Sequence, residues 1–363
     1  MSTGERSPER RPTLDPASAA IRTAVREALS PATAATASRG PNPPVVIVAV
    51  SGGADSMALL HACAFLHRRD EVSARAVTVD HGLQSASAAV AERVRTTAES
   101  WGVPAETIAV QVSAGVEGLE AAAREARYGV LENVRQRVGA EWIITAHTRN
   151  DQAETVLLGL LRGSGTRSLA GMAPRTARLL RPLLGLDRSD TEASCRAQGI
   201  EVWDDPMNTD PAFARVRARG LVERFERELG QPLAANLART ADLCRADADC
   251  LDEVAWTVAA ELAERREIDL IPLRDLPEAI LSRALRSWLL SLGVPAQGFG
   301  ADRIATLCRL VRSRTRGRLS LPGDTEALVD RDRLSFRDVE RAGRSQRTPP
   351  RSRPPEATST PPL

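Results

Sequence analysis

The segment Val45–Leu60, which reads VVIVAVSGGADSMALL, constrains the fold more than any other part of the chain. An apolar run rich in β-branched residues comes first, and it breaks abruptly into Ser-Gly-Gly-Ala-Asp-Ser. Such an unbroken apolar run is typical of a strand that is buried on both faces, as in a parallel sheet. The apolar segment after the break favours a helix. The sequence therefore predicts a buried strand, a tight loop and a helix in direct succession.

The predicted loop has a composition suited to binding phosphate. Gly52 and Gly53 allow a ligand to approach the backbone closely, and the following helix directs free N–H groups and its positive dipole end at an anion. The common nucleoside-triphosphatase loop is excluded because it needs a lysine, and the chain contains none. A plain strand-to-helix turn is the alternative. We expect a nucleotide to contact the loop residues Ser51, Gly52, Gly53, Ala54, Asp55 and Ser56.

Asp55 adds a second indication, because a carboxylate beside a phosphate site would repel the phosphate. A bridging divalent cation such as Mg²⁺ removes this conflict. A carboxylate at this position can instead cap the helix, and the two roles are compatible. Asp55 is therefore a candidate ligand for a metal ion.

Strands and helices are predicted to alternate up to about residue 161. This alternation indicates an α/β fold with a doubly wound parallel sheet and right-handed crossovers. Ligands of such sheets bind beyond the carboxyl ends of the strands. Polar residues cluster at three predicted strand ends, so we expect Ser51–Ser56, Asp80–Gly82 and His147–Glu154 to converge. Asp80 and His81 become candidate nucleotide contacts. Strands are expected at Ala74–Val79, Thr107–Val112 and Trp142–Ala146, and helices at Ser56–His67, Ser87–Trp101, Glu117–Val138 and Gln152–Leu161.

The third polar cluster lies in TAHTRNDQAET, from Thr145 to Thr155. Asn150 or Asp151 is expected to cap the helix, with Glu154 placed as in a capping box. Asp151 and Glu154 are three residues apart, so both carboxylates face one side of the helix start. Such a pair suits a metal ion or an ammonium group. His147 is a further candidate because it follows a strand end.

The long helix predicted at Glu117–Val138 contains AREARY, from Ala123 to Tyr128. Arg124 and Arg127 are three residues apart on one face of this helix. A solvated stripe is the ordinary interpretation of such a pattern. Binding of a nucleotide phosphate by Arg124 is the alternative.

The composition along the chain divides it into four parts. Residues 1–44 are expected to be a disordered tail with one helix and a linker, and residues 45–214 to form the nucleotide domain. Residues 215–337 predict a smaller, all-helical domain that ends in a short β hairpin at Arg318–Phe336. Residues 338–363 are rich in Arg, Pro, Ser and Thr, so a disordered tail is expected.

Global composition limits the cellular context. The net charge of +2 gives no strong attraction to nucleic acid, although every cationic side chain is arginine and so suits phosphate contacts. The five cysteines form no Cys-x-x-Cys pair, which indicates reduced thiols. No secretory signal and no apolar run of about 20 residues is present, so no contact with a membrane is expected. The sequence predicts a soluble, cytoplasmic protein.

Several motifs resemble those of a known family. SGGADS resembles the signature of the PP-loop (N-type) ATP pyrophosphatases, whose nucleotide domain is Rossmann-like. Within that superfamily, further stretches are similar to the tRNA(Ile)-lysidine synthases, in matching order over residues 45–217. These stretches are VDHGL (Val79–Leu83), AREARY (Ala123–Tyr128), AHTRNDQAETVLL (Ala146–Leu158), LRGSG (Leu161–Gly165), LAGM (Leu169–Met172), RPLL (Arg181–Leu184), and Asp205, Pro206, Asn208, Phe213 and Arg215.

The resemblance implies an ATP- and Mg²⁺-dependent ligase. Such enzymes adenylate the carbon-2 oxygen of the wobble cytidine in the CAU anticodon of tRNA(Ile). The ε-amine of free L-lysine then displaces AMP to give lysidine. The implied partners are tRNA(Ile) and L-lysine, and a homodimer is left open.

The resemblance also implies roles for individual residues. Asp55 and Asp151 would hold the metal, and Asp151 and Glu154 would bind the incoming lysine. Arg124 would contact the α-phosphate, and His147 would position the nucleotide or the metal. Contacts with tRNA are expected from Arg127, Asn208, Arg215, Arg217 and Arg219, although spacing alone equally fits a solvated helix start for the last three.

Three positions depart from the pattern of the family. Asn150 stands where many relatives have a second aspartate, Thr148 replaces a frequent second histidine, and Val216 replaces a common asparagine. Three rival functions are considered. One is a PP-loop tRNA thiolase, which generally relies on cysteines. Another is a small-molecule synthetase with the same loop, although such enzymes have no arginine-rich helical extension of this kind. The third is a non-catalytic nucleotide- or RNA-binding relative.

Overall fold

The computed structural model describes residues 15–30, 42–82, 84, 86–111, 119–296 and 299–339. The chain forms two compact units, Met1–Ala248 and Asp249–Leu363. Helix α9, Leu233–Leu262, contains the boundary between them. The domain boundary expected near residue 215 therefore differs from the division between the units. The tails predicted at residues 1–14 and 340–363, and the linker residues 31–41, lie outside the described residues.

The first unit is built on a five-stranded parallel sheet with the strand order β3-β2-β1-β4-β5. The order reverses between β1 and β4, and ligands of such sheets bind at this reversal. The predicted doubly wound parallel sheet is confirmed. Its strands are β1 (Val45–Ala49), β2 (Ser73–Asp80), β3 (Ala105–Ala109), β4 (Trp142–Ile144) and β5 (Leu179–Leu180).

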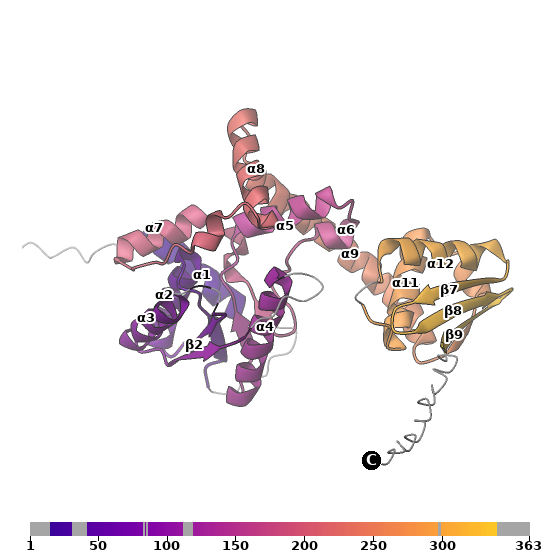
Figure 1. Ribbon diagram of the computed structural model, residues 1–363, viewed down its shortest axis with the longest axis horizontal. Helices are drawn as coiled ribbons and strands as arrows, with labels where there is room; N and C mark the ends of the chain where they lie inside the picture. Colours follow the sequence, from indigo (N-terminus) through magenta and orange to yellow (C-terminus); the bar gives the residue numbers. More distant parts are fainter. Residues whose placement is uncertain are drawn as a thin grey trace, which may run out of the picture. The chain divides into compact units, whose positions relative to one another are not determined.

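Helices cover both faces of this sheet, as the unbroken apolar run at β1 predicted. Successive side chains of a strand point to opposite faces. Val46 and Val48 pack into the core beneath α2 and α3, whereas Ile47 packs with Leu131 and Val134 of α4. Figure 1 shows α2 and α3 on one side of β2 and α4 on the other. The covering helices are α2 (Ala54–His67), α3 (Ser87–Ser100), α4 (Leu119–Val138) and α7 (Arg188–Gln198).

Helix α1, Pro16–Leu29, belongs to the core of the first unit. Its Ile21 and Val25 are fully buried, and the helix packs against α2 and α7. The Ser18 and Ser194 hydroxyls are also hydrogen-bonded, 2.8 Å apart. The predicted boundary at residue 45 is wrong in leaving this helix out. Its amphipathic spacing is visible in the sequence, but the helices that cover its apolar face lie far along the chain.

The remaining elements of the first unit follow β4 and β5, and the part of α9 up to Ala248 completes it. These remaining elements are α5 (Arg149–Leu161), α6 (Thr166–Leu169), η2 (Pro182–Gly185), η3 (Pro206–Thr209) and α8 (Ala214–Leu229). Helix α7 begins after its N-cap residue Asp187, which forms a capping box with Asp190.

The second unit is not all-helical, in contrast to the prediction. Its antiparallel sheet has the order β6-β9-β8-β7, so the expected hairpin is part of a larger sheet. Trp288 is fully buried in a core shared by helices and strands. In the described part of the chain, no helix combines the length and apolar character needed to cross a membrane. The elements are α10 (Ile271–Arg274), α11 (Glu278–Ser291), α12 (Ala301–Ser313), β6 (Glu267–Asp269), β7 (Gly317–Leu321), β8 (Thr325–Asp330) and β9 (Arg333–Asp338).

We predict that Ile21→Ala lowers the free energy of unfolding by about 3 kcal/mol, because it leaves a cavity between α1, α2 and α7. Thr23→Ala, on the exposed face of the same helix, is the control and should change it by less than about 0.5 kcal/mol. Urea denaturation of both variants measures the difference. Equal stability of the two variants would show that α1 does not contribute to the core.

Candidate active site

A cavity of about 520 Å³ opens at the carboxyl ends of β1, β2 and β4. Its volume is in the range of small-molecule and cofactor sites. All three polar clusters that the sequence placed at strand ends contribute to its walls, so their predicted convergence is confirmed. The lining residues from these clusters are Ser51, Gly53, Ala54, Asp55, Ser56, Asp80, His81, His147 and Asp151.

The loop after β1 is held open by contacts with its own serine and with a distant segment. Ser56 Oγ accepts a hydrogen bond from the Ser51 N–H (3.1 Å) and donates one to the Gly53 carbonyl (2.9 Å). The Trp203 N–H donates to the Gly52 carbonyl (2.9 Å). Gly52 has a φ of +90°, and a Cβ there would lie 2.9 Å from Val90 Cγ1. The loop therefore requires glycine at this position.

Helix α2 begins without a side-chain cap. Its N-cap residue is Gly53, which forms no side-chain hydrogen bond to the first turn. The first-turn N–H groups of a helix have no partner within the helix, and they attract anions. The alternative in which Asp55 caps this helix is therefore wrong. The N-terminus of α2 retains the donors that a phosphate needs.

Asp55 instead points towards α7. Its Oδ1 accepts a hydrogen bond from Thr191 Oγ1, and its Oδ2 lies 3.7 Å from Arg188 Nε. Burial raises the pKa of Asp55, while the Thr191 hydrogen bond and the Arg188 charge oppose that rise. Asp55 thus lines the cavity with one oxygen held by a hydroxyl and the other facing a cation.

Helix α5 begins three residues earlier than predicted, with Thr148 as its N-cap. Asp151 Oδ2 accepts hydrogen bonds from the Thr148 N–H (2.7 Å) and from Thr148 Oγ1 (3.0 Å). The prediction of Asn150 or Asp151 as the cap, with Glu154 in the capping box, is therefore wrong. Asn150 Oδ1 accepts from the Arg188 N–H instead (2.9 Å). Thr148 and Asn150, which depart from the pattern of the family, are thus both used in local structure.

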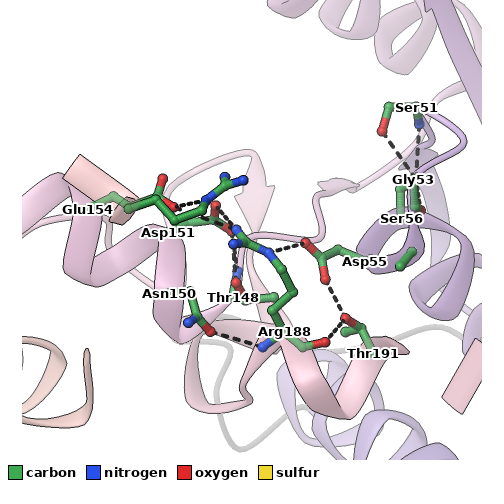
Figure 2. Close-up of polar contacts among 12 residues, drawn as sticks. Ser51, Gly53, Asp55, Ser56, Thr148, Asn150, Asp151, Glu154, Arg188 and Thr191 are labelled. Carbon is green, nitrogen blue, oxygen red and sulfur yellow. Dashed lines mark hydrogen bonds and ion pairs between the residues drawn. The ribbon is translucent and has the colours of Figure 1, made fainter. Parts of the chain in front are cut away.

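Asp55, Asp151 and Glu154 surround the guanidinium of Arg188, and we call these three carboxylates the acidic cluster (Figure 2). Arg188 Nη2 lies 3.2 Å from Asp151 Oδ1 and 3.7 Å from Glu154 Oε1. Asp151 and Glu154 therefore face the same side of α5, as their spacing predicted. Arg219 also pairs with Glu154, at 2.8 Å between Nε and Oε1.

Electrostatics within the acidic cluster follow from burial and from the neighbouring charges. The Glu154 side chain is only 3% exposed. Burial and then the Asp151 carboxylate raise the pKa of Glu154, although Arg219 and Arg188 oppose them. For Arg188, burial acts to lower the pKa, but Asp151, Asp55 and Glu154 together raise it. Arg188 is therefore a permanent cation in this site.

His147 lies at the carboxyl end of β4 and lines the cavity. Thr145 Oγ1 is 2.9 Å from its Nδ1. Burial lowers the pKa of His147 to about 3, and the charge of Arg181 acts in the same direction while Asp151 opposes it. The imidazole is therefore neutral at physiological pH and acts through hydrogen bonds.

Of the two arginines predicted on the long helix, only Arg127 is among the described residues that line the cavity. Burial lowers the pKa of Arg127. Arg124 has its guanidinium 5.0 Å from the ring centre of Tyr128, and Tyr128 lines the cavity. Near them, burial and the charge of Arg127 lower the pKa of His81, whose Nδ1 is buried without a hydrogen-bond partner in the described residues. Asp80 Oδ1 accepts from the Gly82 N–H (2.9 Å).

Three of the residues predicted to contact tRNA, Arg127, Asn208 and Arg219, line the cavity. Arg219 Nε donates a hydrogen bond to Glu154 Oε1. Arg217 Nη1 donates to the carbonyls of Pro211 and Ala212, at 2.6 and 2.8 Å, and so ties α8 to the preceding loop. Arg215 lies near enough to His147 and Arg127 to lower the pKa of both through its charge, after burial.

Several residues of the site were missed by sequence reasoning. Arg188 and Thr191 come from α7, and Trp203 from the segment after it, and none was singled out. The Asp-x-x-Asp pattern at Asp187–Asp190 could have predicted the start of α7. No local signal indicates that the Arg188 side chain contacts Asp151, which lies 37 residues earlier.

The donor set fits a metal that arrives with a nucleotide. Among the residues that the structure describes, no group of three or more His, Cys, Asp or Glu side chains is arranged to hold a metal ion. Asp55 and Asp151 do share one cation, Arg188. Mg²⁺ typically uses one or two protein carboxylates and takes its other ligands from phosphates and water. Two carboxylates beside a phosphate loop match that preference.

The sheet order and the SGGADS loop at its reversal define the class of this chain as a PP-loop ATP pyrophosphatase. The sequence model of the PP-loop domain matches residues 25–224, and that of the TilS substrate binding domain matches residues 268–335. PP-loop ATP pyrophosphatases use ATP. The U34-tRNA thiolase NcsA from Methanococcus maripaludis shares the fold, with a TM-score of 0.52 and 14% identity over 62% of this chain and 78% of that one.

Curated relatives define the family more narrowly. The tRNA(Ile)-lysidine synthase of Thermobifida fusca is 45% identical over 85% of this chain and 94% of its own length. That of Streptomyces coelicolor is 46% identical over 82% of this chain and 86% of its own. The chain belongs to the tRNA(Ile)-lysidine synthase family.

We predict that Gly52→Ala weakens binding of a non-hydrolysable ATP analogue by about tenfold or more. An alanine at this position would be strained by its positive φ, and its Cβ would collide with Val90. Gly220→Ala, at an exposed helical position with no atom near the added Cβ, is the matched control and should leave binding unchanged. Calorimetric titration measures both. Unchanged affinity in Gly52→Ala would remove the loop from the nucleotide site.

The lowered pKa of His147 predicts a loss of stability in mild acid. Below its ordinary pKa of about 6.5, the unfolded chain takes up a proton at this imidazole, whereas the folded chain does not until about pH 3. The free energy of unfolding should therefore fall by about 1 kcal/mol more between about pH 7.5 and 5.5 in wild type than in His147→Gln. Urea titrations at both pH values provide the measurement. Parallel losses in the two proteins would contradict the burial argument.

Proposed function

We propose that this chain attaches L-lysine to carbon 2 of the wobble cytidine in the CAU anticodon of tRNA(Ile). The observation that carries this proposal is a single cavity with an anion-binding loop and a cation-binding acidic cluster. The reaction needs both. ATP transfers AMP to the carbon-2 oxygen and releases pyrophosphate, and the ε-amine of lysine then displaces AMP to give lysidine.

The loop after β1 is assigned to the phosphates of ATP. Its backbone N–H groups and the N-terminus of α2 would stabilise the pyrophosphate as it leaves. The assigned contacts also include the hydroxyls of Ser51 and Ser56. Asp55 and Asp151 would hold Mg²⁺, which would neutralise part of the phosphate charge.

Side chains from α4 and from the ends of β2 and β4 are assigned to the nucleoside and the α-phosphate. Arg124, positioned by Tyr128, is proposed to meet the α-phosphate as the nucleotide enters. His147 is neutral, so it would orient the nucleotide by a hydrogen bond without adding charge. His81, next to Asp80, lines the cavity, and its imidazole is assigned to the nucleotide.

The acidic cluster is assigned to the nucleophile. Asp151 and Glu154 would attract the ε-ammonium of lysine and orient it before it loses a proton and attacks carbon 2. Contact with tRNA is proposed for Arg127, Asn208 and Arg215, with Arg217 and Arg219 acting through the local contacts described above. A homodimer and a cytoplasmic location remain predictions from the sequence.

The thiolase alternative is disfavoured by the cysteines. Burial raises the pKa of Cys63 to about 12 and that of Cys195 to about 11. Thiols are reactive as thiolates, so these two are unreactive at neutral pH. No cysteine is among the described residues that line the cavity. The shared fold with the U34-tRNA thiolase is therefore no evidence for sulfur transfer here.

We predict that Asp151→Asn reduces the kcat/KM for lysine about 100-fold, because a carboxylate that binds the ammonium becomes neutral. Asparagine keeps an acceptor for the Thr148 N–H, so the start of α5 should survive. Radiolabelled lysine incorporation into tRNA(Ile) measures the full reaction, and pyrophosphate release without lysine measures adenylation. Adenylation should fall less than lysine incorporation, because Asp55 and the nucleotide phosphates would still hold the Mg²⁺ that Asp151 shares.

Asp242→Asn, which neutralises a surface carboxylate of α9, is the control and should incorporate lysine as wild type does. Absence of any ATP-dependent lysine incorporation by the wild-type chain would overturn the proposed function. Pyrophosphate release that requires a sulfur donor in place of lysine would favour the thiolase.

A further inference from the structure

The site proposed for the lysine ammonium already contains a cation of the protein itself. Arg188 is the first residue of α7, and its guanidinium lies among carboxylates from α2 and α5. Figure 2 shows its side chain reaching from α7 to Asp55 on one side and to Asp151 and Glu154 on the other. A guanidinium and an alkylammonium both carry a positive charge and donate hydrogen bonds, so they compete for the same oxygens.

The contacts of Arg188 with the acidic cluster are long. Its nitrogens lie 3.7, 3.2 and 3.7 Å from the oxygens of Asp55, Asp151 and Glu154. Arg219 and Glu154, by contrast, make a hydrogen bond of 2.8 Å. One guanidinium shared among three carboxylates satisfies none of them with a short ion pair. Each contact of Arg188 with a carboxylate is therefore longer than the one between Arg219 and Glu154.

The charges of the acidic cluster also favour a further cation. Its three carboxylates face two protein cations, Arg188 and Arg219. The Mg²⁺ assigned to Asp55 and Asp151 would arrive with the negative charge of the nucleotide phosphates, so an ammonium would still be attracted to Asp151 and Glu154 when the nucleotide is bound.

The backbone of Arg188 is fixed while its side chain faces the cavity. Its N–H donates to Asn150 Oδ1 at 2.9 Å, which ties the first turn of α7 to the start of α5. The side chain is 22% exposed and lines the cavity. Rotation of the side chain alone can therefore take the guanidinium out of the acidic cluster without moving α7.

We propose that Arg188 is an exchangeable internal counter-ion, which the ε-ammonium of lysine replaces at Asp151 and Glu154. This inference rests on the proposed function, because it takes the acidic cluster as the lysine site. Buried carboxylates without a partner are strongly unfavourable, so the internal cation protects the site until lysine arrives. Because the bound lysine must displace Arg188, this residue sets the affinity of the enzyme for its nucleophile.

Replacement of Arg188 should strengthen lysine binding, whereas loss of a merely structural arginine would weaken it or leave it unchanged. We expect Arg188→Gln to bind L-lysine about tenfold more tightly than wild type, measured calorimetrically on the full chain with a non-hydrolysable ATP analogue. Arg188→Lys keeps an internal cation and should stay near wild type. Arg149→Gln is the matched control, since Arg149 lies at the same junction but pairs with Asp187. It should bind lysine as wild type does.

A second measurement covers the case in which the glutamine variant is unstable. n-Butylammonium, a mimic of the lysine side chain, should raise the unfolding temperature of Arg188→Gln more than that of wild type. Weaker or unchanged lysine binding in Arg188→Gln, or failure of n-butylammonium to stabilise it preferentially, would overturn the inference.

Asp151→Asn separates this inference from the proposed function on which it rests. If Asp151→Asn loses lysine affinity but Arg188→Gln gains none, only the exchange is wrong. If Asp151→Asn binds lysine as wild type does, the acidic cluster is not the lysine site.

Discussion

The central constraint on this molecule is that the PP-loop and the acidic cluster meet at one cavity. Backbone N–H groups and carboxylates so close together would hydrogen-bond to each other unless both were held in place. Helix α7 provides many of the contacts that hold the acidic cluster in place. Thr191 and Arg188 hold Asp55 from its first turn, while the buried Ser194 and Cys195 pack against the core beneath. Helix α1 packs against α7, so it supports the site although none of its described residues lines the cavity.

Most of the nucleotide-binding fold could be predicted because its signals are local. The apolar run at Val45–Val50 determines a strand buried on both faces, and the glycines after it determine where the chain must turn. Errors appeared where the signal depends on distant partners. The apolar stripe of α1 does not reveal which helices cover it. In the second unit, β6 has only three residues, and its antiparallel pairing with β9 joins segments more than 60 residues apart, so neither propensity nor pattern indicates a sheet.

The same distinction separates the predicted from the missed residues of the site. Asp151 and Glu154 could be found because a spacing of three on a helix places both on one face. Arg188 could not, since an arginine at the start of a helix is ordinarily a solvated residue. Only the fold brings it to Asp151, which lies 37 residues earlier, and to Asp55 on α2. Its role also explains Asn150, whose amide oxygen holds the Arg188 backbone, so the departure at this position does not remove a structural contact.

The carboxylate of Asp151 is oriented by the start of α5, because the Thr148 N–H and Oγ1 both donate hydrogen bonds to its Oδ2. The helix is itself held in place, since Gln152 pairs with both the N–H and the carbonyl of Met172, and Arg245 of α9 donates to the same carbonyl. Gly171 has to be glycine there, because a Cβ would lie 2.7 Å from Gln152 Oε1. In the proposed exchange, the carboxylates keep their positions while the cation between them is replaced, which suits an enzyme whose nucleophile is itself a cation.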